Sequence, residues 1–345
     1  MFNSLRSIWK PGMYHGQGQR DQFFEGWYYK LVDSSQNHRW AVIPGIFKQT
    51  DPNQSHAFIQ VLDGLTRQAT FHRYPLDSFQ ASNSSFNFRI GANHFHQEGL
   101  ALDIQGENQT ISGELHFDPI QPWPVTILSP GAMGWYTFLP FMQTYHGILG
   151  LDHRISGDLT INGNQIDFSD GRGYMEKDWG KTFPRAYIWM QSNHFSSLGT
   201  SLTASVATIP WLGSWFRGFI VGLFHNDRLY RFTTYLGSEL QQLTLTDKQV
   251  IWRLHGNART NRVHPFSGYQ LEMIARRSEG GLIAAPEITG MEPRIVESLT
   301  ANIEVRMSAI RSGENKEEVL FEGIGECAGL EVAGSVEEIV EEVDI

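Results

Sequence analysis

Apolar and polar positions alternate with a period of two in many short runs along this chain. Such a period places neighbouring side chains on opposite faces of an extended backbone, so these runs predict β-strands. In the segment 158–168, two runs flank Asn162-Gly163, a dipeptide typical of hairpin turns. The sequence has no long run with the 3.6-residue period of a helix. We therefore predict an all-β protein, with a short terminal helix over residues 336–343 as the exception.

The predicted strands form two groups, separated by a break near residues 170–185. The first group comprises residues 24–32, 39–48, 56–62, 86–90, 100–104, 112–117 and 158–168. The second comprises residues 186–195, 202–208, 218–225, 229–235, 250–255 and 269–275, with Asn226-Asp227 as a hairpin turn. A chain of 345 residues exceeds the usual size of one hydrophobic core. We therefore predict two antiparallel β units, each closing as a barrel or sandwich, over residues 1–180 and 181–345.

Composition fits this architecture and restricts the function. The chain has 34 glycines, 12% aromatic and 19% charged residues, as expected for many turns and apolar pockets. Its net charge is -10, and residues 314–345 hold eleven carboxylates and one cation. We interpret this end as a solvated acidic tail, with an interaction tail as the alternative. No region is basic, so we expect no nucleic-acid partner.

The cysteine content and the absence of apolar targeting segments indicate the cellular compartment. Its single cysteine, Cys327, cannot form an internal disulfide, which fits a reducing compartment. The N-terminal residues show no apolar core of a signal peptide. The most apolar stretch, residues 205–224, contains Pro210 and Arg217, which argue against a spanning helix. We expect a cytoplasmic protein.

The segment 173–180, Gly-Tyr-Met-Glu-Lys-Asp-Trp-Gly, is the first candidate for chemistry. In an extended backbone, Glu176 and Asp178 point to one face and Lys177 to the other. Two carboxylates that face an aromatic-lined cavity can differ in pKa, which is what a proton donor needs. The alternative is a charged connector between domains, in which nearby cations pair with the acids.

Three other segments hold candidates. Glu25 is an acid among aromatic residues in 24–29, and a strand-entry glutamate paired with a cation is the alternative. Segment 133–147 is aromatic, and Tyr145 and His146 are its proton-transfer groups, although His146 also fits a core histidine. Segment 133–147 fits either a pocket wall or a surface that contacts lipid, and segment 209–216 suits a membrane interface. Packing between domains is the alternative for 209–216.

Taken together, several motifs resemble the tocopherol cyclase family. Their order and approximate spacing agree with the family along most of the chain, up to about Tyr235. They are Phe23-Phe24-Glu25-Gly26-Trp27-Tyr28, Gly134-Trp135 with Phe138-x-Pro140, Tyr174-x-Glu176-Lys177-x-Trp179-Gly180, Phe183-Pro184-Arg185, and Trp189-x-Gln191-x-Asn193-x-Phe195. Asp178 departs from the family pattern, which has Asn there, so the chain resembles a divergent member.

The resemblance implies a fold and an activity. The fold is a pair of lipocalin-like β-barrels. The activity closes a prenylated benzoquinol into a chromanol: an acid protonates the alkene of the prenyl tail, and the phenolic oxygen traps the cation. This chemistry requires no cofactor and no metal. A lipid-binding protein without turnover and a hydratase acting on an isoprenoid alkene remain the alternatives.

The resemblance and the motifs together give a set of expected site residues. The proton donor is Glu176 or Asp178, with Glu25 as the third choice. Gln191 and Asn193 hydrogen-bond the quinol head. The ligand is a hydrophobic small molecule, a prenylquinol or another isoprenoid. The other expected substrate-binding residues are Trp27, Tyr28, Tyr145, His146, Tyr174, Lys177, Trp179 and Trp189.

Overall fold

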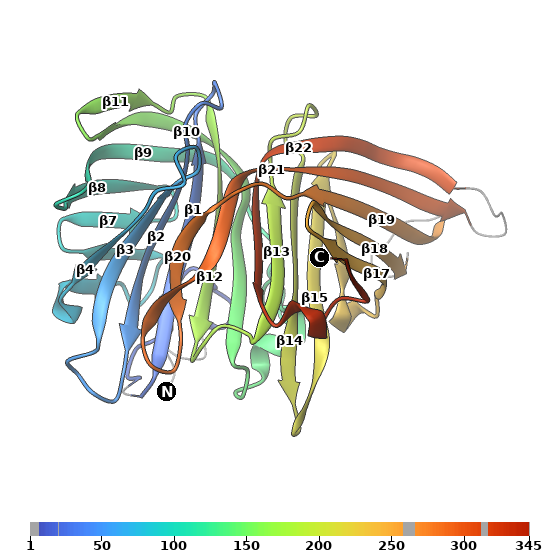
Figure 1. Ribbon diagram of the computed structural model, residues 1–345, viewed down its shortest axis with the longest axis horizontal. Helices are drawn as coiled ribbons and strands as arrows, with labels where there is room; N and C mark the ends of the chain where they lie inside the picture. Colours follow the sequence, from blue (N-terminus) through green and yellow to red (C-terminus); the bar gives the residue numbers. More distant parts are fainter. Residues whose placement is uncertain (1–6, 20, 258–265, 312–316, 345) are drawn as a thin grey trace. The chain divides into compact units, whose positions relative to one another are not determined.

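The computed structural model describes residues 7–19, 21–257, 266–311 and 317–344 (Figure 1). The chain divides into two compact units. One contains residues 1–183 and 281–295, and the other contains residues 184–280 and 296–345. The all-β prediction is confirmed, because the named elements are strands and short 3-10 helices. None of the described helical segments is long and apolar enough to span a membrane. Residues 1–6, part of the sequence in which no signal peptide was recognised, lie outside the described residues.

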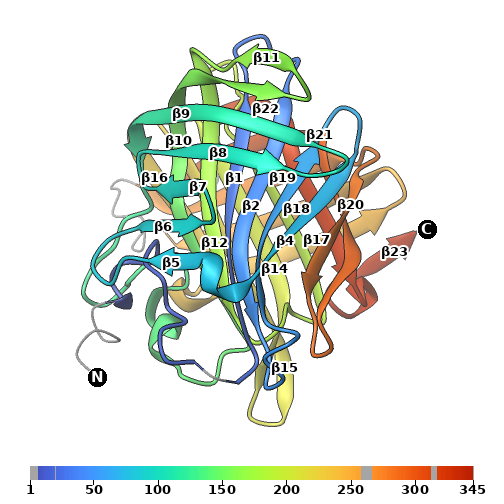
Figure 2. The same cartoon turned by 90° about the vertical axis from the view of Figure 1, so that its left-hand side faces the viewer.

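The first unit is built on one twelve-stranded antiparallel sheet. Its strands are β1 (Phe23–Val32), β2 (Arg39–Lys48), β3 (His56–Asp63), β4 (Ala69–Tyr74), β5 (Phe79–Ala81), β6 (Asn87–Ile90), β7 (Asn93–His96), β8 (Gly99–Gln105), β9 (Thr110–Gln121), β10 (Thr144–Ile161), β11 (Asn164–Asp167) and β12 (Gly171–Gly180). The order is β4-β3-β2-β1-β12-β10-β9-β8-β7-β6-β5, with β11 paired to β10. The sheet curls strongly, so that β5–β9 cross the direction of β1 and β2 (Figure 2). Two 3-10 helices, η1 (Leu76–Ser78) and η2 (Gly134–Phe138), lie in its connections.

A hairpin from the far half of the sequence also belongs to the first unit. It consists of β20 (Gly281–Pro286) and the first residues of β21 (Met291–Arg311). Gln60 of β3 holds it, donating from its side-chain amide to the Ala284 carbonyl (3.2 Å) and accepting from the Ala284 N–H (2.7 Å). The two units are therefore not two uninterrupted halves of the sequence.

The concave side of the first sheet is filled with aromatic side chains. On β1, the buried Trp27 and Tyr29 point into this core. Trp27 packs on Phe88 with ring centroids 4.1 Å apart, and Phe88 packs on Phe95 at 5.1 Å. Aromatic side chains bury large areas, so this cluster is a major stabilising feature of the unit.

The second unit is built on an eleven-stranded sheet. Its strands are β13 (Ala186–Ser192), β14 (Ser201–Trp211), β15 (Ser214–His225), β16 (Arg228–Thr233), β17 (Glu239–Thr246), β18 (Gln249–Asn257), β19 (Phe266–Arg276), most of β21, β22 (Glu317–Gly334) and β23 (Glu342–Asp344), with β20 paired to β21. The order is β16-β15-β14-β13-β22-β21-β19-β18-β17-β23. Its pairs are antiparallel except β17–β23, which is parallel. The unit also contains the 3-10 helices η3 (Thr234–Leu236) and η4 (Val336–Glu338).

The acidic end of the chain differs from its prediction. Residues 317–334 form β22, which pairs with β13 on one side and β21 on the other. Cys327 and Leu330 are buried, and Glu331 accepts a hydrogen bond from the Tyr187 hydroxyl (2.6 Å). The interpretation as a solvated tail is therefore wrong for this stretch, while Glu314 and Lys316 lie outside the described residues. The prediction of a terminal helix over residues 336–343 is also wrong, because a three-residue 3-10 helix and a strand occupy that region.

The two predicted hairpin turns are confirmed by their backbone angles. Asn162 and Gly163 have φ values of 51° and 81°, and Asn226 and Asp227 have 49° and 57°. Positive φ at both central residues is the requirement of the turn type that matches the twist of paired strands.

We predict that Gly157→Ala destabilises the first unit far more than Gly163→Ala. Gly157 has φ 105°, and an added Cβ would lie 2.2 Å from the backbone oxygen of Glu114 on the neighbouring strand. Gly163 has φ 81° but open space around it. We expect losses of about 3 kcal/mol and about 1 kcal/mol, respectively. Urea unfolding of both variants measures this, and equal losses would contradict the close strand approach.

Candidate acid site

The segment 173–180 is part of β12, a central strand of the first sheet. It pairs with β1 on one side and β10 on the other. Nearly all of its residues are buried. The alternative of a charged connector is therefore wrong, and the predicted break over residues 170–185 contains a full strand. The charged side chains of β12 project from both faces of the sheet.

β12 presents different chemistry on its two faces. Met175 and Trp179 belong to the aromatic core, and the fully buried Lys177 lies between them in the alternation. Glu176 and Asp178 therefore project from the opposite face. This is the arrangement that the alternation predicts.

On the outer face of β12, four side chains form a cluster that we call the acid cluster: Tyr174, Glu176, Asp178 and His146. His146 on β10 stands directly opposite Asp178 in the strand register. Its Nδ1 lies 2.9 Å from Asp178 Oδ1, and its Nε2 lies 3.9 Å from Glu176 Oε2. The Tyr174 hydroxyl donates a hydrogen bond to Glu176 Oε2 (2.6 Å). One imidazole thus contacts two carboxylates.

The acid cluster is shielded but not closed. The side chains of His146, Glu176 and Asp178 are 15%, 7% and 25% exposed. Burial disfavours a charge on His146, but the Asp178 and Glu176 carboxylates outweigh it and raise the pKa of His146 to about 9. The imidazole therefore carries a proton at neutral pH. On the same face, Tyr28 of β1 stands opposite Glu176 in the register.

The acid cluster also has the composition of a metal site. The ligand atoms of His146, Glu176 and Asp178 lie within 4.8 Å of one another. An imidazole with two carboxylates is a donor set that divalent transition metals accept. The expectation that the protein uses no metal stays a prediction.

The inner face of β12 carries a buried ion pair. Lys177 Nζ lies 2.5 Å from Glu25 Oε1 on β1, and both side chains are fully buried. The Glu25 carboxylate also accepts hydrogen bonds from the backbone N–H groups of His15 (2.9 Å) and Gly16 (3.0 Å). Burial alone would raise the pKa of Glu25, but Lys177 and His15 hold it below its ordinary value. Glu25 is thus ionised at neutral pH and has no proton to donate there.

The N-terminal segment, residues 11–16, completes the environment of Lys177. The Lys177 ammonium donates to the backbone carbonyls of Pro11 (3.0 Å) and Met13. It also lies 4.7 Å and 4.8 Å from the ring centroids of Trp27 and Trp179, at cation–π distance. Burial lowers the pKa of Lys177 to about 8, against the opposing attraction of Glu25. Lys177, Trp27 and Trp179 are therefore parts of one packed assembly around the ion pair.

His15 is a neighbour of the ion pair that no sequence pattern indicates. Its ring stacks on Trp179 at 4.3 Å, and its Nδ1 lies 2.7 Å from Lys177 Nζ. Tyr145 stacks on Trp179 as well, at 5.5 Å. His15 precedes the first strand and belongs to no periodic run, so no local signal linked it to β12.

Three of the expected site residues lie in the second unit. Trp189 and Gln191 lie on β13 and are 5% and 0% exposed. Ile188 and Met190, which alternate with them, belong to the core of this unit, so Trp189 and Gln191 face the other side of the sheet. Asn193 follows the strand, and its side-chain oxygen lies 3.0 Å from His194 Nδ1. Their role toward a quinol stays a prediction.

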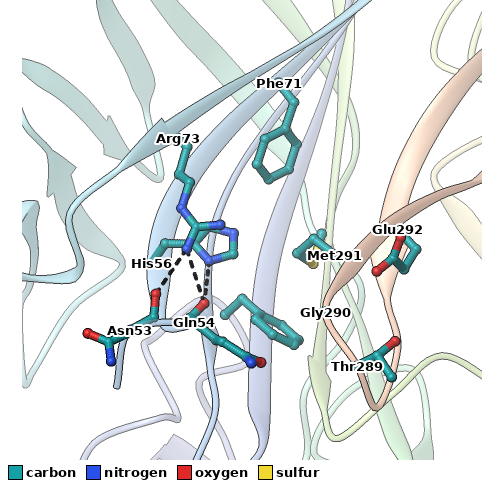
Figure 3. A pocket seen from close by; sticks show the side chains of 10 residues that line it. Asn53, Gln54, His56, Phe71, Arg73, Thr289, Gly290, Met291 and Glu292 are labelled. Atoms are coloured by element: carbon teal, nitrogen blue, oxygen red, sulfur yellow. Dashed lines mark hydrogen bonds between the residues drawn. The ribbon is translucent and has the colours of Figure 1, made fainter. Parts of the chain in front are cut away.

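A separate pocket of about 400 Å³ opens in the first unit, between the β3–β4 edge and the turn of the 281–295 hairpin. In Figure 3, His56, Arg73 and Phe71 line one side of it, and Thr289, Met291 and Glu292 the other. His56 Nδ1 lies 2.8 Å from the Gln54 carbonyl oxygen. The lining includes no expected site residue, so this pocket is distinct from the acid cluster.

We predict that Lys177→Met lowers the free energy of unfolding by about 3–5 kcal/mol, because it leaves the Glu25 charge buried without a partner. The double variant Lys177→Met/Glu25→Gln regains part of the loss, since no charge remains. Arg253→Met, which breaks the exposed Arg253–Glu272 pair, is the control and costs below about 1 kcal/mol. Urea unfolding compares the three, and a double variant no more stable than Lys177→Met contradicts the ion-pair account.

Two curated plant proteins are similar to part of this chain. Probable tocopherol cyclase, chloroplastic, from Oryza sativa subsp. japonica is 23% identical over 231 residues, which are 66% of this chain and 47% of the relative. Tocopherol cyclase, chloroplastic, from Zea mays is 24% identical over 233 residues, with the same shares. The chain spans about half the length of the curated relatives that it matches.

Two solved structures align with most of the chain. A protein assigned as AttH from Nitrosomonas europaea has a TM-score of 0.47 and 14% identity, covering 91% of this chain and 93% of its own. Kievitone hydratase from Nectria haematococca has a TM-score of 0.44 and 13% identity, covering 94% and 93%. At such scores, neither carries weight for function.

The family model "Tocopherol cyclase-like" matches residues 66–334. This range includes β12 and β13, and with them the acid cluster and Trp189, Gln191 and Asn193. The resemblance inferred from the motifs is thereby confirmed. The chain belongs to the tocopherol cyclase-like family.

Proposed function

We propose that this protein protonates the alkene of a prenylated quinol and thereby closes it into a chromanol. The observation that carries the proposal is the acid cluster, in which His146 lies beside Glu176 and Asp178, whose carboxylates raise its pKa to about 9. Membership of the family and the similarity to the rice and maize tocopherol cyclases support this choice of reaction.

The proton moves from His146 to Glu176 when substrate binds. At rest, the imidazolium and the carboxylate are both charged, and partial exposure to water stabilises them. An apolar prenyl tail over the cluster excludes that water, and a low-dielectric environment favours neutral imidazole and neutral carboxylic acid. The separation of 3.9 Å between His146 Nε2 and Glu176 Oε2 requires a small approach before transfer.

The reaction is balanced without a further reactant. Glu176 transfers its proton to one alkene carbon and leaves a tertiary cation on the other. The phenolic oxygen of the quinol attacks this cation and forms the C–O bond, and the phenolic proton returns to the cluster. Asp178 stays paired with His146 Nδ1 and positions the imidazole. Substrate and product are isomers.

Incubating the purified protein with prenylated hydroquinols in D2O tests the proposal. The expected product has a shifted retention and one carbon-bound deuterium, and it forms equally with and without a chelator. A mass gain of one water would indicate hydration instead. Tight binding without any product would indicate a carrier.

We predict that Glu176→Gln lowers turnover by at least about a hundredfold, because it removes the proton donor. Asp178→Asn, which keeps the shape but not the charge beside His146, lowers it about tenfold. Asp158→Asn, at an exposed position on β10, is the matched control and keeps full activity. Full activity in both cluster variants would falsify the assignment of the acid.

The pH profile gives an independent prediction. The cluster holds its proton below the His146 pKa of about 9, so turnover is level at neutral pH and falls about tenfold per pH unit above it. The titratable groups on the same face are Glu176, Asp178 and Tyr174 of β12 and Tyr28 and Lys30 of β1. Asp178→Asn removes a negative charge, so its descending limb moves to lower pH. A descending limb of the pH profile with its midpoint near pH 6.5 in the unaltered protein contradicts the proposal.

A further inference from the structure

The connection between β9 and β10 is long and carries no charge. Residues 119–145 contain no Asp, Glu, Lys, Arg or His, although 19% of the whole chain is charged. Exposed loops normally carry charged residues, because water solvates them well. An uncharged connection that is also aromatic therefore has a purpose other than solubility.

Several large apolar side chains of this connection are exposed. Ile127 and Leu128 are 78% and 82% exposed, and Phe141 is 54% exposed. Trp9 contacts two residues of this connection, Ile127 and Phe138. We use the term apolar face for Trp9 and the largest exposed apolar residues of the connection: Ile127, Leu128, Trp135, Phe138 and Phe141. Single exposed apolar residues are common, but a group of this size indicates an interaction site.

The backbone holds the apolar face in place. Thr126 and Ser129 exchange backbone hydrogen bonds of 2.9 Å and 3.2 Å, which puts Ile127 and Leu128 at the tip of a tight turn. The Trp9 indole N–H donates to the Ile127 carbonyl (3.2 Å), and its ring packs on Phe138 at 5.8 Å. In Figure 2 this green segment lies near the N-terminal segment. The exposed side chains are therefore presented by an ordered loop.

The same loop is bonded to the strand that carries His146. The Tyr145 hydroxyl donates to the Leu139 carbonyl, and the His146 backbone N–H donates to the Met133 sulfur at 3.1 Å. The connection that carries the apolar face is thus hydrogen-bonded to His146 of the acid cluster.

We propose that the apolar face docks the protein on a lipid surface of neutral or zwitterionic head groups. Tryptophan and phenylalanine beside aliphatic tips suit the interface between head groups and acyl chains. The absence of charge over residues 119–145 matches a lipid surface without net charge better than an anionic one.

Co-sedimentation with phosphatidylcholine vesicles tests the proposal without any enzyme assay, so it is independent of the proposed function. We expect the unaltered protein to partition onto the vesicles, with little change between low and high salt. Ile127→Ser/Leu128→Ser lowers the partition coefficient at least about tenfold, because two highly exposed apolar side chains are lost. Leu198→Ser, at an 83% exposed position in the other unit, is the matched control and binds normally.

A second readout guards against a misfolded variant. Brominated phosphatidylcholine quenches tryptophans that enter the head-group region, and Trp135→Phe reduces this quenching while leaving the circular dichroism spectrum unchanged. No vesicle binding by the unaltered protein overturns the proposal, as does an equal loss in Leu198→Ser. Self-association that Ile127→Ser/Leu128→Ser abolishes, without vesicle binding, assigns the face to a second copy of the chain and also overturns it.

Discussion

The first unit depends on the ion pair between Lys177 and Glu25. Both charges are fully buried, and a buried ion without its partner costs several kcal/mol, so the two strands and the segment 11–16 must meet in one arrangement. That arrangement fixes which face of β12 points into the core. Because side chains alternate along a strand, a one-residue slip would move Lys177 to the outer face and turn Glu176 and Asp178 into the aromatic core. The position of the acid cluster on the outer face therefore follows from the ion pair on the inner face.

The two faces use charge in opposite ways. On the inner face, Lys177 and Glu25 are enclosed by backbone groups and indole rings, and their charges are fully compensated. This is a structural use of charge, and Glu25, held ionised by Lys177 and His15, has no proton to donate at neutral pH. On the outer face, two carboxylates share one imidazole, whose proton is held more tightly than usual but remains partly accessible. Such unequal environments for neighbouring acids are typical of sites that transfer protons.

Much of this arrangement could be predicted from the sequence because it is local. The all-β class, both hairpin turns and the separation of Glu176 and Asp178 from Lys177 follow from periods and turn residues. The contact partners of the charged residues do not follow from such local patterns. His15 reaches Lys177 from outside any strand, and His146 meets Asp178 through a register that contains bulges further along β10. The acidic strand β22 is not predictable in this way, because glycines interrupt its alternation and its pairing partners are distant in the sequence.

A nuclear magnetic resonance titration of the His146 imidazole tests the central claim most directly. The account requires that Asp178 and Glu176 keep this ring protonated at neutral pH. With labelled histidine, and the resonance assigned by its loss in His146→Asn, the account predicts a pKa of about 9. In Asp178→Asn the pKa falls toward the ordinary value. A pKa at or below 6.5 in the unaltered protein would contradict the account, because the cluster would then hold no proton at neutral pH.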